Sequence, residues 1–385
     1  MRWIGSALSV VSLIILLTST LLSHVRVHAD EGAAVVEAEA ETSVAPDEFV
    51  RLAAKGKAEA IRATLDAGMD INVRNATGLT AWHAATVRGY MKLADQLVEW
   101  GADTSVPLPP LGDIADQTLQ RDRPEDDPAL VVLVAKDGEV LWEAAYGHAD
   151  RGGDIAATPQ TKFRIGSVTK QFTAAAIVKL QEEGKLSVQD PLSKFFSDFP
   201  RGDEVTLHHL LTHTSGIHSY TSDASFGTRV TKRIEVDDLI DQIKGYDFDF
   251  DPGEKFVYCN SGYMLLGKIV ELASGQSYAD YLQETFFDPL QMNDTGVYVN
   301  GNDYPQEASG YSYVSEKFQD AKPWDMSWAG GAGAIYSTTH DMMRWNEGVF
   351  GGKVLREEST QAAFTPVKLN DGSPHPYGYG WLISE

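Results

Sequence analysis

A repeat with a period of 33 residues lies near the N-terminus and restricts the fold of that region strongly. Gly56 and Gly68 recur as Gly89 and Gly101. This period is that of one β-turn followed by two helices, and glycines are common just past helix ends because they tolerate a left-handed backbone. Two copies rarely bury a continuous core, since stacked repeats usually number three or more. We therefore predict a small all-α module over residues 48–106 that packs against a neighbour.

The second copy of the repeat has the clearer pattern. Residues 80–85 read Thr-Ala-Trp-His-Ala-Ala, and residues 97–103 end in Trp-Gly-Ala-Asp. These stretches resemble the ankyrin repeat. The resemblance leaves two alternatives open. The module could be a surface that binds a protein partner, or a structural element that packs against the rest of the chain. His83 lies where the ankyrin pattern has a hydrogen-bonding structural histidine, so we do not expect it to bind a ligand.

The first 29 residues have the features of an export signal. Residues 4–22 form an almost uninterrupted apolar run behind Arg2, and residues 27–29 read Val-His-Ala, a pattern that a signal peptidase accepts. Cleavage before Asp30 would leave an exported protein, periplasmic or extracellular. The alternative is an uncleaved membrane anchor, because the run approaches the roughly 20 residues that span a bilayer.

Two acidic segments flank the predicted helical module. Residues 30–47 are mostly Ala, Glu and Val, and residues 107–128 combine prolines with many acids, which is typical of linkers. The formal charge of the whole chain is −23, so nucleic acid and anionic membrane surfaces are not expected partners. Cys259 is the one cysteine, which excludes an intrachain disulfide and a cysteine-rich metal site.

Residues 129–385 begin with a hairpin pattern and continue with helical patterns. Two apolar runs, residues 131–134 and 140–142, flank an Asp-Gly pair, which favours a tight turn between strands. Strands followed by helices indicate an α+β fold in which an antiparallel sheet carries helical layers. The predicted helical segments cover residues 168–183, 205–213, 236–243, 261–273 and 278–286.

Ser167 and Lys170 are the strongest candidates for a nucleophile and its base. They lie three positions apart at the start of a predicted helix, so their side chains share a face. A serine hydroxyl is a weak nucleophile until a neighbour accepts its proton, and a lysine with a lowered pKa can do so. The helix N-terminus would also favour negative charge on the serine oxygen. The pattern is short, and the alternative is an N-capping serine beside a surface lysine.

Tyr258 and Asn260 form a second candidate element. They lie two residues apart on a predicted loop, after a Pro-Gly-Glu turn at residues 252–254 and before an apolar helix. Their side chains should point the same way, so the phenol could move a proton and the amide could bind an amide of the substrate. Tyr298 and Asn300 have the same spacing, but they lack the Pro-Gly entry and the helix. We therefore favour Tyr258.

Motifs of two other hydrolase classes are absent from the sequence. The chain has no G-x-S-x-G elbow and no H-E-x-x-H zinc helix. His209 and His213 are spaced i, i+4 and would share a helical face, but no third ligand is apparent. We expect no metal and no organic cofactor, and a structural role for His213.

From about residue 129 onward, the chain resembles the class C β-lactamase and penicillin-binding DD-peptidase group of serine hydrolases, a β-lactamase-related family. The resemblance implies the α+β fold of β-lactamases and DD-peptidases, with an antiparallel sheet and helical layers. Five ordered motifs carry the resemblance, at residues 163–173, 210–217, 252–267, 329–338 and 377–381.

The resemblance also implies a role for each candidate residue. Ser167 would be the acylated nucleophile and Lys170 its proton acceptor. Tyr258 would pass a proton to the leaving nitrogen, and Asn260 would bind an amide of the substrate. The backbone N–H of Ser167 would form half of an oxyanion hole. Cys259 stands where the family often has serine, and a thiol beside the tyrosine could make the enzyme sensitive to oxidation or mercurials.

One element of the family is missing from the sequence. A K-T-G or H-x-G strand normally follows the motif at residues 377–381, but the sequence ends at Glu385. Residues 136–138 spell Lys-Asp-Gly in the wrong place, and His375 is followed by proline. We expect a fragment or a truncated product without the last sheet strands. A chain that truly ended there would have weak activity and low stability.

Two functions remain in competition. The first is an exported serine hydrolase that forms an acyl-enzyme with a β-lactam, a D-alanyl peptide or a related small amide or ester. The second is a non-catalytic or esterase-like relative, in which the ankyrin-like repeats and a degenerate pocket serve binding. The sequence contains all four candidate residues: Ser167, Lys170, Tyr258 and Asn260. Their joint presence favours the enzyme, because a pocket that catalyses no reaction would not need the whole set.

Overall fold

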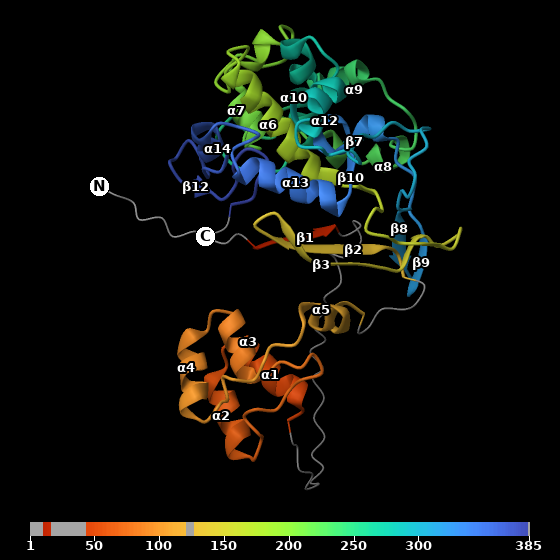
Figure 1. The fold of residues 1–385 in the computed structure, drawn as a ribbon. Helices are drawn as coiled ribbons and strands as arrows, with labels where there is room; N and C mark the ends of the chain where they lie inside the picture. The colour runs from red at the N-terminus through yellow and green to blue at the C-terminus, as the bar shows by residue number, and fades with distance from the viewer. Residues whose placement is uncertain (1–10, 17–43, 121–126, 384–385) are drawn as a thin grey trace, which may run out of the picture. The chain divides into compact units, whose positions relative to one another are not determined.

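The computed structural model describes residues 11–16, 44–120 and 127–383. The chain divides into two compact units: residues 24–125 form the smaller one, and residues 126–385 form the larger one together with the first 23 residues. The smaller unit is built of helices, and the larger unit combines sheets with helices (Figure 1).

Three sequence predictions fall wholly or partly outside the described residues: the export signal at residues 1–29, the acidic linker at 30–47 and part of the linker at 107–128. Within the first of these, strand β1 (Val11–Leu16) pairs antiparallel with β2 (Leu130–Lys136). The predicted domain boundaries and the export signal stay predictions. Within the described ranges, no helix is long and apolar enough to cross a membrane.

Two helix pairs make up most of the smaller unit. Its helices are α1 (Pro46–Ala54), α2 (Ala58–Asp66), α3 (Ala81–Val87), α4 (Met91–Glu99) and α5 (Leu111–Gln120). The glycines of the repeat all have a left-handed backbone, with φ of 67° and 97° at Gly56 and Gly68 and of 75° and 106° at Gly89 and Gly101. Helices are therefore present where the repeat predicts them, and their identity as ankyrin repeats stays a prediction.

Helix α3 begins with a capping box that uses a histidine. The backbone N–H of His83 donates to Thr80 Oγ1 (3.4 Å), and His83 Nδ1 accepts from the backbone N–H of Thr80 (3.2 Å). Nε2 of the same ring lies 3.0 Å from the carbonyl oxygen of Val106. Because Nδ1 accepts, Nε2 carries the proton and donates it. The buried ring thus accepts a backbone N–H at the start of α3 and holds the loop that follows α4 through a hydrogen bond to Val106.

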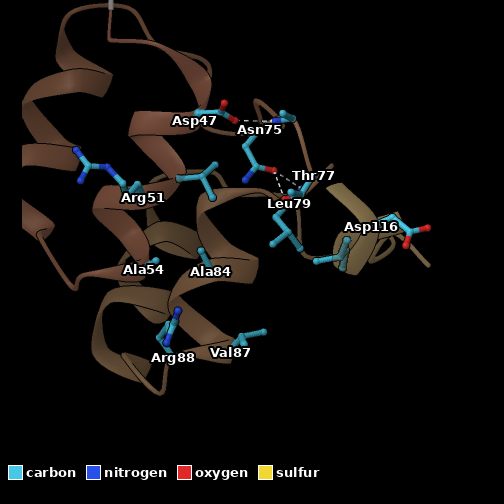
Figure 2. A pocket seen from close by; sticks show the side chains of 13 residues that line it. Asp47, Arg51, Ala54, Asn75, Thr77, Leu79, Ala84, Val87, Arg88 and Asp116 are labelled. Carbon is cyan, nitrogen blue, oxygen red and sulfur yellow. Dashed lines mark hydrogen bonds between the residues drawn. The ribbon is translucent and has the colours of Figure 1, made fainter. Parts of the chain in front are cut away.

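A groove of about 1020 Å³ lies within the helical unit (Figure 2). Apolar side chains of α1 and α3 line it, among them Val50, Ala84 and Val87. Two arginines, Arg51 and Arg88, also line it. None of the four candidate site residues belongs to this groove.

The larger unit contains a three-stranded antiparallel sheet in the order β1-β2-β3. Strand β3 (Glu139–Tyr146) follows β2 after a two-residue turn. The turn residues Asp137 and Gly138 have φ of 51° and 83°. Two successive left-handed residues are the mark of a type I′ turn, whose twist matches that of the strands. The hairpin predicted from the Asp-Gly pair is therefore confirmed.

Short strands and helices complete the larger unit. The strands are β4 (His148–Asp150), β5 (Ile155–Ala156), β6 (Phe163–Arg164), β7 (Gly296–Val297), β8 (Tyr311–Val314), β9 (Lys317–Asp320), β10 (Ile335–Ser337), β11 (Val367–Lys368) and β12 (Pro374–His375). The α-helices are α6 (Thr169–Glu182), α7 (Leu207–Leu211), α8 (Phe226–Arg229), α9 (Val236–Lys244), α10 (Asn260–Ser274), α11 (Tyr278–Leu282), α12 (Gly330–Gly333), α13 (Thr339–Phe350) and α14 (Glu357–Ala363). Single turns lie at η1 (Gly166–Val168), η2 (Leu192–Lys194), η3 (Tyr220–Ser222), η4 (Gln283–Phe287) and η5 (Met326–Trp328). The α+β arrangement is confirmed.

Helices α6 and α10 form the centre of the helical layer, and α13 packs between that layer and β2 (Figure 1). The ring of Phe172 on α6 stacks on Trp345 of α13, with ring centroids 4.0 Å apart. Helix α12 lies close against α10 because glycines meet there. A Cβ at Gly331 would lie 2.6 Å from the carbonyl oxygen of Tyr263 and 2.9 Å from Cα of Gly267. Only glycine allows this approach, which places α12 beside the start of α6.

Candidate active site

Ser167 lies at the junction of a strand and a helix. Strand β6 pairs with β10, and Ile165 donates its N–H to the carbonyl oxygen of Ile335 (2.9 Å). Thr169 accepts the N–H of Ile335 on its hydroxyl (3.1 Å), so the start of α6 is held to the same strand. The single turn η1 between these anchors carries Ser167, whose side chain is exposed. Exposure on a fixed turn is what a nucleophile requires.

Lys170 is buried, with 1% of its surface exposed. Its Nζ donates to Ser167 Oγ (3.2 Å), to Asn260 Oδ1 (2.9 Å) and to the carbonyl oxygen of Ala332 (2.8 Å). Burial lowers the pKa of the Lys170 amine to about 7, because removal from water disfavours the charged form. Near neutral pH, therefore, a substantial fraction of the amine is unprotonated and can accept the proton of Ser167.

Tyr258 completes the arrangement from the loop before α10. Nζ of Lys170 lies 4.8 Å from the centroid of its ring. Burial raises the pKa of the Tyr258 phenol, and a hydrogen bond with Ser167 opposes that rise in part. The phenol therefore keeps its proton at neutral pH, in contact with the hydroxyl that would react.

Asn260 is the first residue of α10, and both ends of its amide have partners. Its Oδ1 accepts from Lys170, and its Nδ2 donates to Thr221 Oγ1 (3.0 Å). Its backbone N–H donates to Ser219 Oγ (3.1 Å). The predicted contact with a substrate amide stays a prediction. The structure shows that Asn260 orients the amine of Lys170.

The structure thus brings together all four residues singled out in the sequence: Ser167, Lys170, Tyr258 and Asn260. An amine that can be neutral at pH 7 contacts an exposed hydroxyl, and a protonated phenol lies beside both. This set can deprotonate a nucleophile and reprotonate a leaving group without a metal ion.

Two residues of the site were missed in the sequence. The carbonyl oxygen of Ala332 accepts from Lys170, and the hydroxyl of Thr221 orients Asn260. The run Gly330-Gly331-Ala332-Gly333 could have suggested close approach of a backbone, since glycines permit it. Thr221 has no sequence signal, because its contact with Asn260 depends on the path of a loop.

The rejected tyrosine and asparagine have structural partners. Tyr298 accepts from Arg164 Nη2 (2.6 Å) and donates to Glu307 Oε2 (3.0 Å). Asn300 donates to the carbonyl oxygen of Trp324 (3.3 Å) and accepts the N–H of Met326 (2.7 Å). Neither contacts Ser167 or Lys170.

Cys259 corrects one expectation, since the sequence suggested a reactive thiol. Its side chain is 4% exposed and donates to the carbonyl oxygen of Ile217 (3.2 Å). Burial raises the pKa of the thiol, so the nucleophilic thiolate is disfavoured. Because the thiol is inaccessible and protonated, it should react slowly with oxidants and mercurials, contrary to the expectation from the sequence.

The two histidines at i, i+4 spacing do not share a helical face. Helix α7 ends at Leu211, and His213 follows it with φ of 59°. His209 instead caps α7, because its Nδ1 accepts the N–H of Thr206 (3.2 Å). Among the residues that the structure describes, no cluster of His, Cys, Asp or Glu could hold a metal ion.

Comparison with known proteins supports a family assignment. Residues 117–385 match the family described as Beta-lactamase. A penicillin-binding protein of Bacillus subtilis (strain 168) is 32% identical over 267 residues, which are 66% of this chain and 59% of that protein. The chain therefore spans between about half and three fifths of the length of the curated relatives it matches.

Solved structures share the fold. A penicillin-binding protein from Bacillus halodurans has a TM-score of 0.55 at 32% identity, covering 62% of this chain and 74% of that chain. FmtA from Staphylococcus aureus has a TM-score of 0.61 at 26% identity, covering 70% and 74%. D-amino acid amidase from Ochrobactrum anthropi has a TM-score of 0.56 at 27% identity, covering 66% and 73%. The larger unit has the β-lactamase and DD-peptidase fold, and the chain belongs to the beta-lactamase family.

Proposed function

We propose that the protein is a serine hydrolase that works through an acyl-enzyme on Ser167. The observation that carries the proposal is the contact of Lys170 Nζ with Ser167 Oγ at 3.2 Å, together with a pKa of the Lys170 amine lowered to about 7 by burial. Base strength and geometry match what a serine nucleophile requires at neutral pH.

The catalytic cycle follows from these positions. Neutral Lys170 accepts the proton of Ser167 as Oγ attacks the carbonyl carbon of an amide, and a tetrahedral oxyanion forms. The phenol of Tyr258 then donates a proton to the leaving nitrogen as the C–N bond breaks, and its own proton is replaced from Lys170. Water then attacks the acyl-enzyme. The proton of the water moves through Tyr258 to Lys170, and Lys170 returns a proton to Ser167 Oγ as the product leaves. The backbone N–H of Ser167 would stabilise the oxyanion, a contribution of about 3 kcal/mol for one donor.

The substrate class we propose is a small amide: a β-lactam, a D-alanyl peptide or a D-amino acid amide. Support comes from similarity to penicillin-binding proteins and to a D-amino acid amidase. A small ester is the second choice. Ser167 could attack its carbonyl carbon in the same way, but an ester has no leaving nitrogen for Tyr258 to protonate. A phenol placed to protonate a leaving group favours amides over esters.

Labelling tests the proposal directly. The full chain is treated with a fluorescent penicillin and, separately, with a fluorescent fluorophosphonate. We expect covalent labelling by both reagents that disappears in Ser167→Ala. Labelling by the penicillin should also fall strongly in Tyr258→Phe, because its leaving group is a nitrogen. The matched control is Tyr298→Phe, which removes a buried tyrosine hydroxyl away from the site and should label as wild type. Labelling that persists in Ser167→Ala would exclude Ser167 as the nucleophile.

We also propose that the protein is exported, on the strength of the apolar run at residues 4–22 and the small residues before Asp30. Fractionation of expressing cells, followed by N-terminal sequencing, tests this proposal. A mature N-terminus at Asp30 outside the cytoplasm is the expected result. An intact N-terminus in the membrane fraction would instead indicate an anchor.

A second candidate function concerns the helical unit, where the groove favours a binding role. We propose that it binds a peptide through an apolar anchor residue. Val50, Ala84 and Val87 offer apolar contact, and Val87 is 73% exposed. The exposed guanidinium of Arg88 lines the same groove and could pair with a carboxylate.

The probe for this groove is a labelled peptide with the sequence of residues 30–43, which is acidic and rich in Ala and Val. Fluorescence anisotropy with the full chain should show binding that weakens in Arg88→Glu. The exposed lysine of α4 gives a matched control, Lys92→Glu, which should bind as wild type. Equal binding by both variants would exclude Arg88 from the interaction.

A further inference from the structure

His213 is a buried residue in a strained place beside the candidate site. It follows the last turn of α7, its backbone has φ of 59°, and 1% of its surface is exposed. A left-handed backbone is uncommon for a residue with a Cβ and persists only where the surroundings hold it. The contacts of His213 must therefore hold this backbone in place.

Two hydrogen bonds join His213 to the residues on either side of Tyr258. The N–H of Val257 donates to the carbonyl oxygen of His213 (3.0 Å). The N–H of Cys259 donates to its Nδ1 (3.1 Å). Between these two bonds, the imidazole lies against the ring of Tyr258, with centroids 4.3 Å apart. One histidine thus touches three consecutive residues of the loop.

The proton positions on the imidazole follow from its partners. Nδ1 accepts from Cys259, so it carries no proton, and Nε2 donates to the hydroxyl of Tyr377 (3.2 Å). That hydroxyl is hydrogen-bonded to Tyr263, whose own hydroxyl donates to the carbonyl oxygen of Leu211 (2.8 Å). Burial lowers the pKa of His213 to about 3, so the ring is neutral throughout the working range of an enzyme.

Apart from its contacts with His213, Ser167 and Lys170, Tyr258 has little support from its own loop. Residues 254–259 contain no helix or strand, and Tyr258 is 42% exposed. A phenol held only by its loop would sample several rotamers, and a misplacement of 1 Å can cost about a hundredfold in rate.

We propose that His213 is a positioning residue that clamps the loop at residues 257–259 and directs the hydroxyl of Tyr258 toward Ser167. This inference rests on the proposed function, in which that hydroxyl transfers a proton. His213 does not act as an acid or a base, because both ring nitrogens are engaged by Cys259 and Tyr377 and neither faces Ser167.

Kinetics of matched variants test the clamp. His213→Asn keeps an acceptor near the position of Nδ1 and a side chain that tolerates the left-handed backbone, but it removes the ring. His213→Ala removes the acceptor as well. We expect the maximal acylation rate to fall about tenfold in the first and up to a hundredfold in the second, with KM little changed. His209→Asn, which alters a histidine that caps α7, is the control and should retain the wild-type rate.

Three results would overturn the proposal. The first is a rate within twofold of wild type in His213→Ala. The second is a loss of folded protein with an unchanged rate per folded molecule, which would make the residue merely structural. The third is the loss of one limb of the pH–rate profile, which would show that His213 exchanges protons in catalysis.

Hydrogen exchange separates failure of the clamp from failure of the proposed function. In the wild type, the amides of Val257 and Cys259 should be protected. The amide of Cys259 should exchange faster in His213→Ala because it loses its acceptor Nδ1, while the amides in the middle of α10 stay protected. If no reagent acylates the wild type but the Cys259 amide responds, the clamp stands and the hydrolase assignment fails. If the Cys259 amide does not respond, the clamp is excluded.

Discussion

Among the residues that the structure describes, His83 is buried in the helical unit and His213 in the larger unit, and the two have different tasks. His83 and His213 are 3% and 1% exposed, and in each the Nδ1 atom accepts a backbone N–H. The N–H bound by His83 lies three residues away at the start of its own helix. The N–H bound by His213 belongs to Cys259, 46 residues along the chain.

The buried polar side chains of the two units thus differ in the partners that they bind. In the described part of the helical unit, Thr64, Thr80 and His83 are buried polar residues, and each bonds to backbone atoms of the same unit. In the larger unit, Lys170 and His213 bond to atoms from distant segments. A buried amine is costly, and its retention beside Ser167 marks a site where charge chemistry has a use.

The largest effect is expected from Lys170→Ala. Loss of the base should lower the rate at which a fluorophosphonate phosphonylates Ser167 by about three orders of magnitude or more. The control is Lys179→Ala, on a later turn of the same helix, which should react as wild type. The rate comes from a time course of fluorescent labelling. Retention of more than about a tenth of the wild-type rate in Lys170→Ala would contradict the role given to this amine.

The next effect is the pH dependence of the same rate. Ser167 needs the neutral form of an amine whose pKa is about 7, so the rate should fall as pH drops below that value. The expected loss approaches tenfold per pH unit well below the pKa and is about fiftyfold between pH 7 and pH 5. Rates are measured over pH 5 to 9, with a melting curve at each pH to show that the units stay folded. A flat profile would place the pKa of Lys170 outside this range.

Substitution of one glycine should lower stability and activity together. Gly331→Ala places a methyl group against the backbone of Tyr263 and Gly267, so α12 must shift and with it the carbonyl oxygen of Ala332 that accepts from Lys170. Overpacking of this kind costs about 1–3 kcal/mol. Gly227→Ala is the control, because a Cβ there meets nothing within 4 Å. Chemical denaturation and labelling report the two effects, and equal behaviour of both variants would contradict the close contact.

His83→Ala should affect the helical unit alone. Loss of the capping box costs about 1–2 kcal/mol, because the N–H of Thr80 loses its acceptor. Hydrogen exchange in the full chain should show faster opening of α3, while the rate of acylation at Ser167 stays within twofold of wild type. A change in that rate would show that the two units do not behave independently.

The smallest effect is expected at Cys259. Cys259→Ser keeps a donor for the carbonyl oxygen of Ile217 and should change the acylation rate less than about twofold. In the folded wild type, a mercurial should not block acylation, because the thiol is buried. Rapid inhibition that disappears in the serine variant would restore the expectation drawn from the sequence.

Much of the fold could be predicted from the sequence, because its signals are local. The Asp-Gly turn between apolar runs gave the hairpin, and a segment predicted as residues 168–183 is helix α6 at Thr169–Glu182. Ser167 and Lys170 were found together, since three positions on a helix fix their distance. Tyr258 and Asn260 were added through their spacing and the family resemblance.

The parts that could not be predicted depend on contacts between distant segments. The carbonyl oxygen of Ala332 reaches Lys170 only because Gly331 and Gly267 let two helices meet closely. The sequence placed His213 on a helical face with His209, but α7 ends first and a left-handed backbone turns His213 toward Tyr258. The burial of Cys259, which decides its reactivity, is likewise a property of the assembled core.

The most direct test of the account is to locate the acyl group itself. The full chain is treated with penicillin at pH 7.5, digested with a protease and analysed by mass spectrometry, beside Lys170→Ala and Ser167→Ala. We expect a penicilloyl adduct on Ser167 in the wild type, little in Lys170→Ala and none in Ser167→Ala. An adduct on another residue, or equal modification of all three proteins, would contradict this expectation.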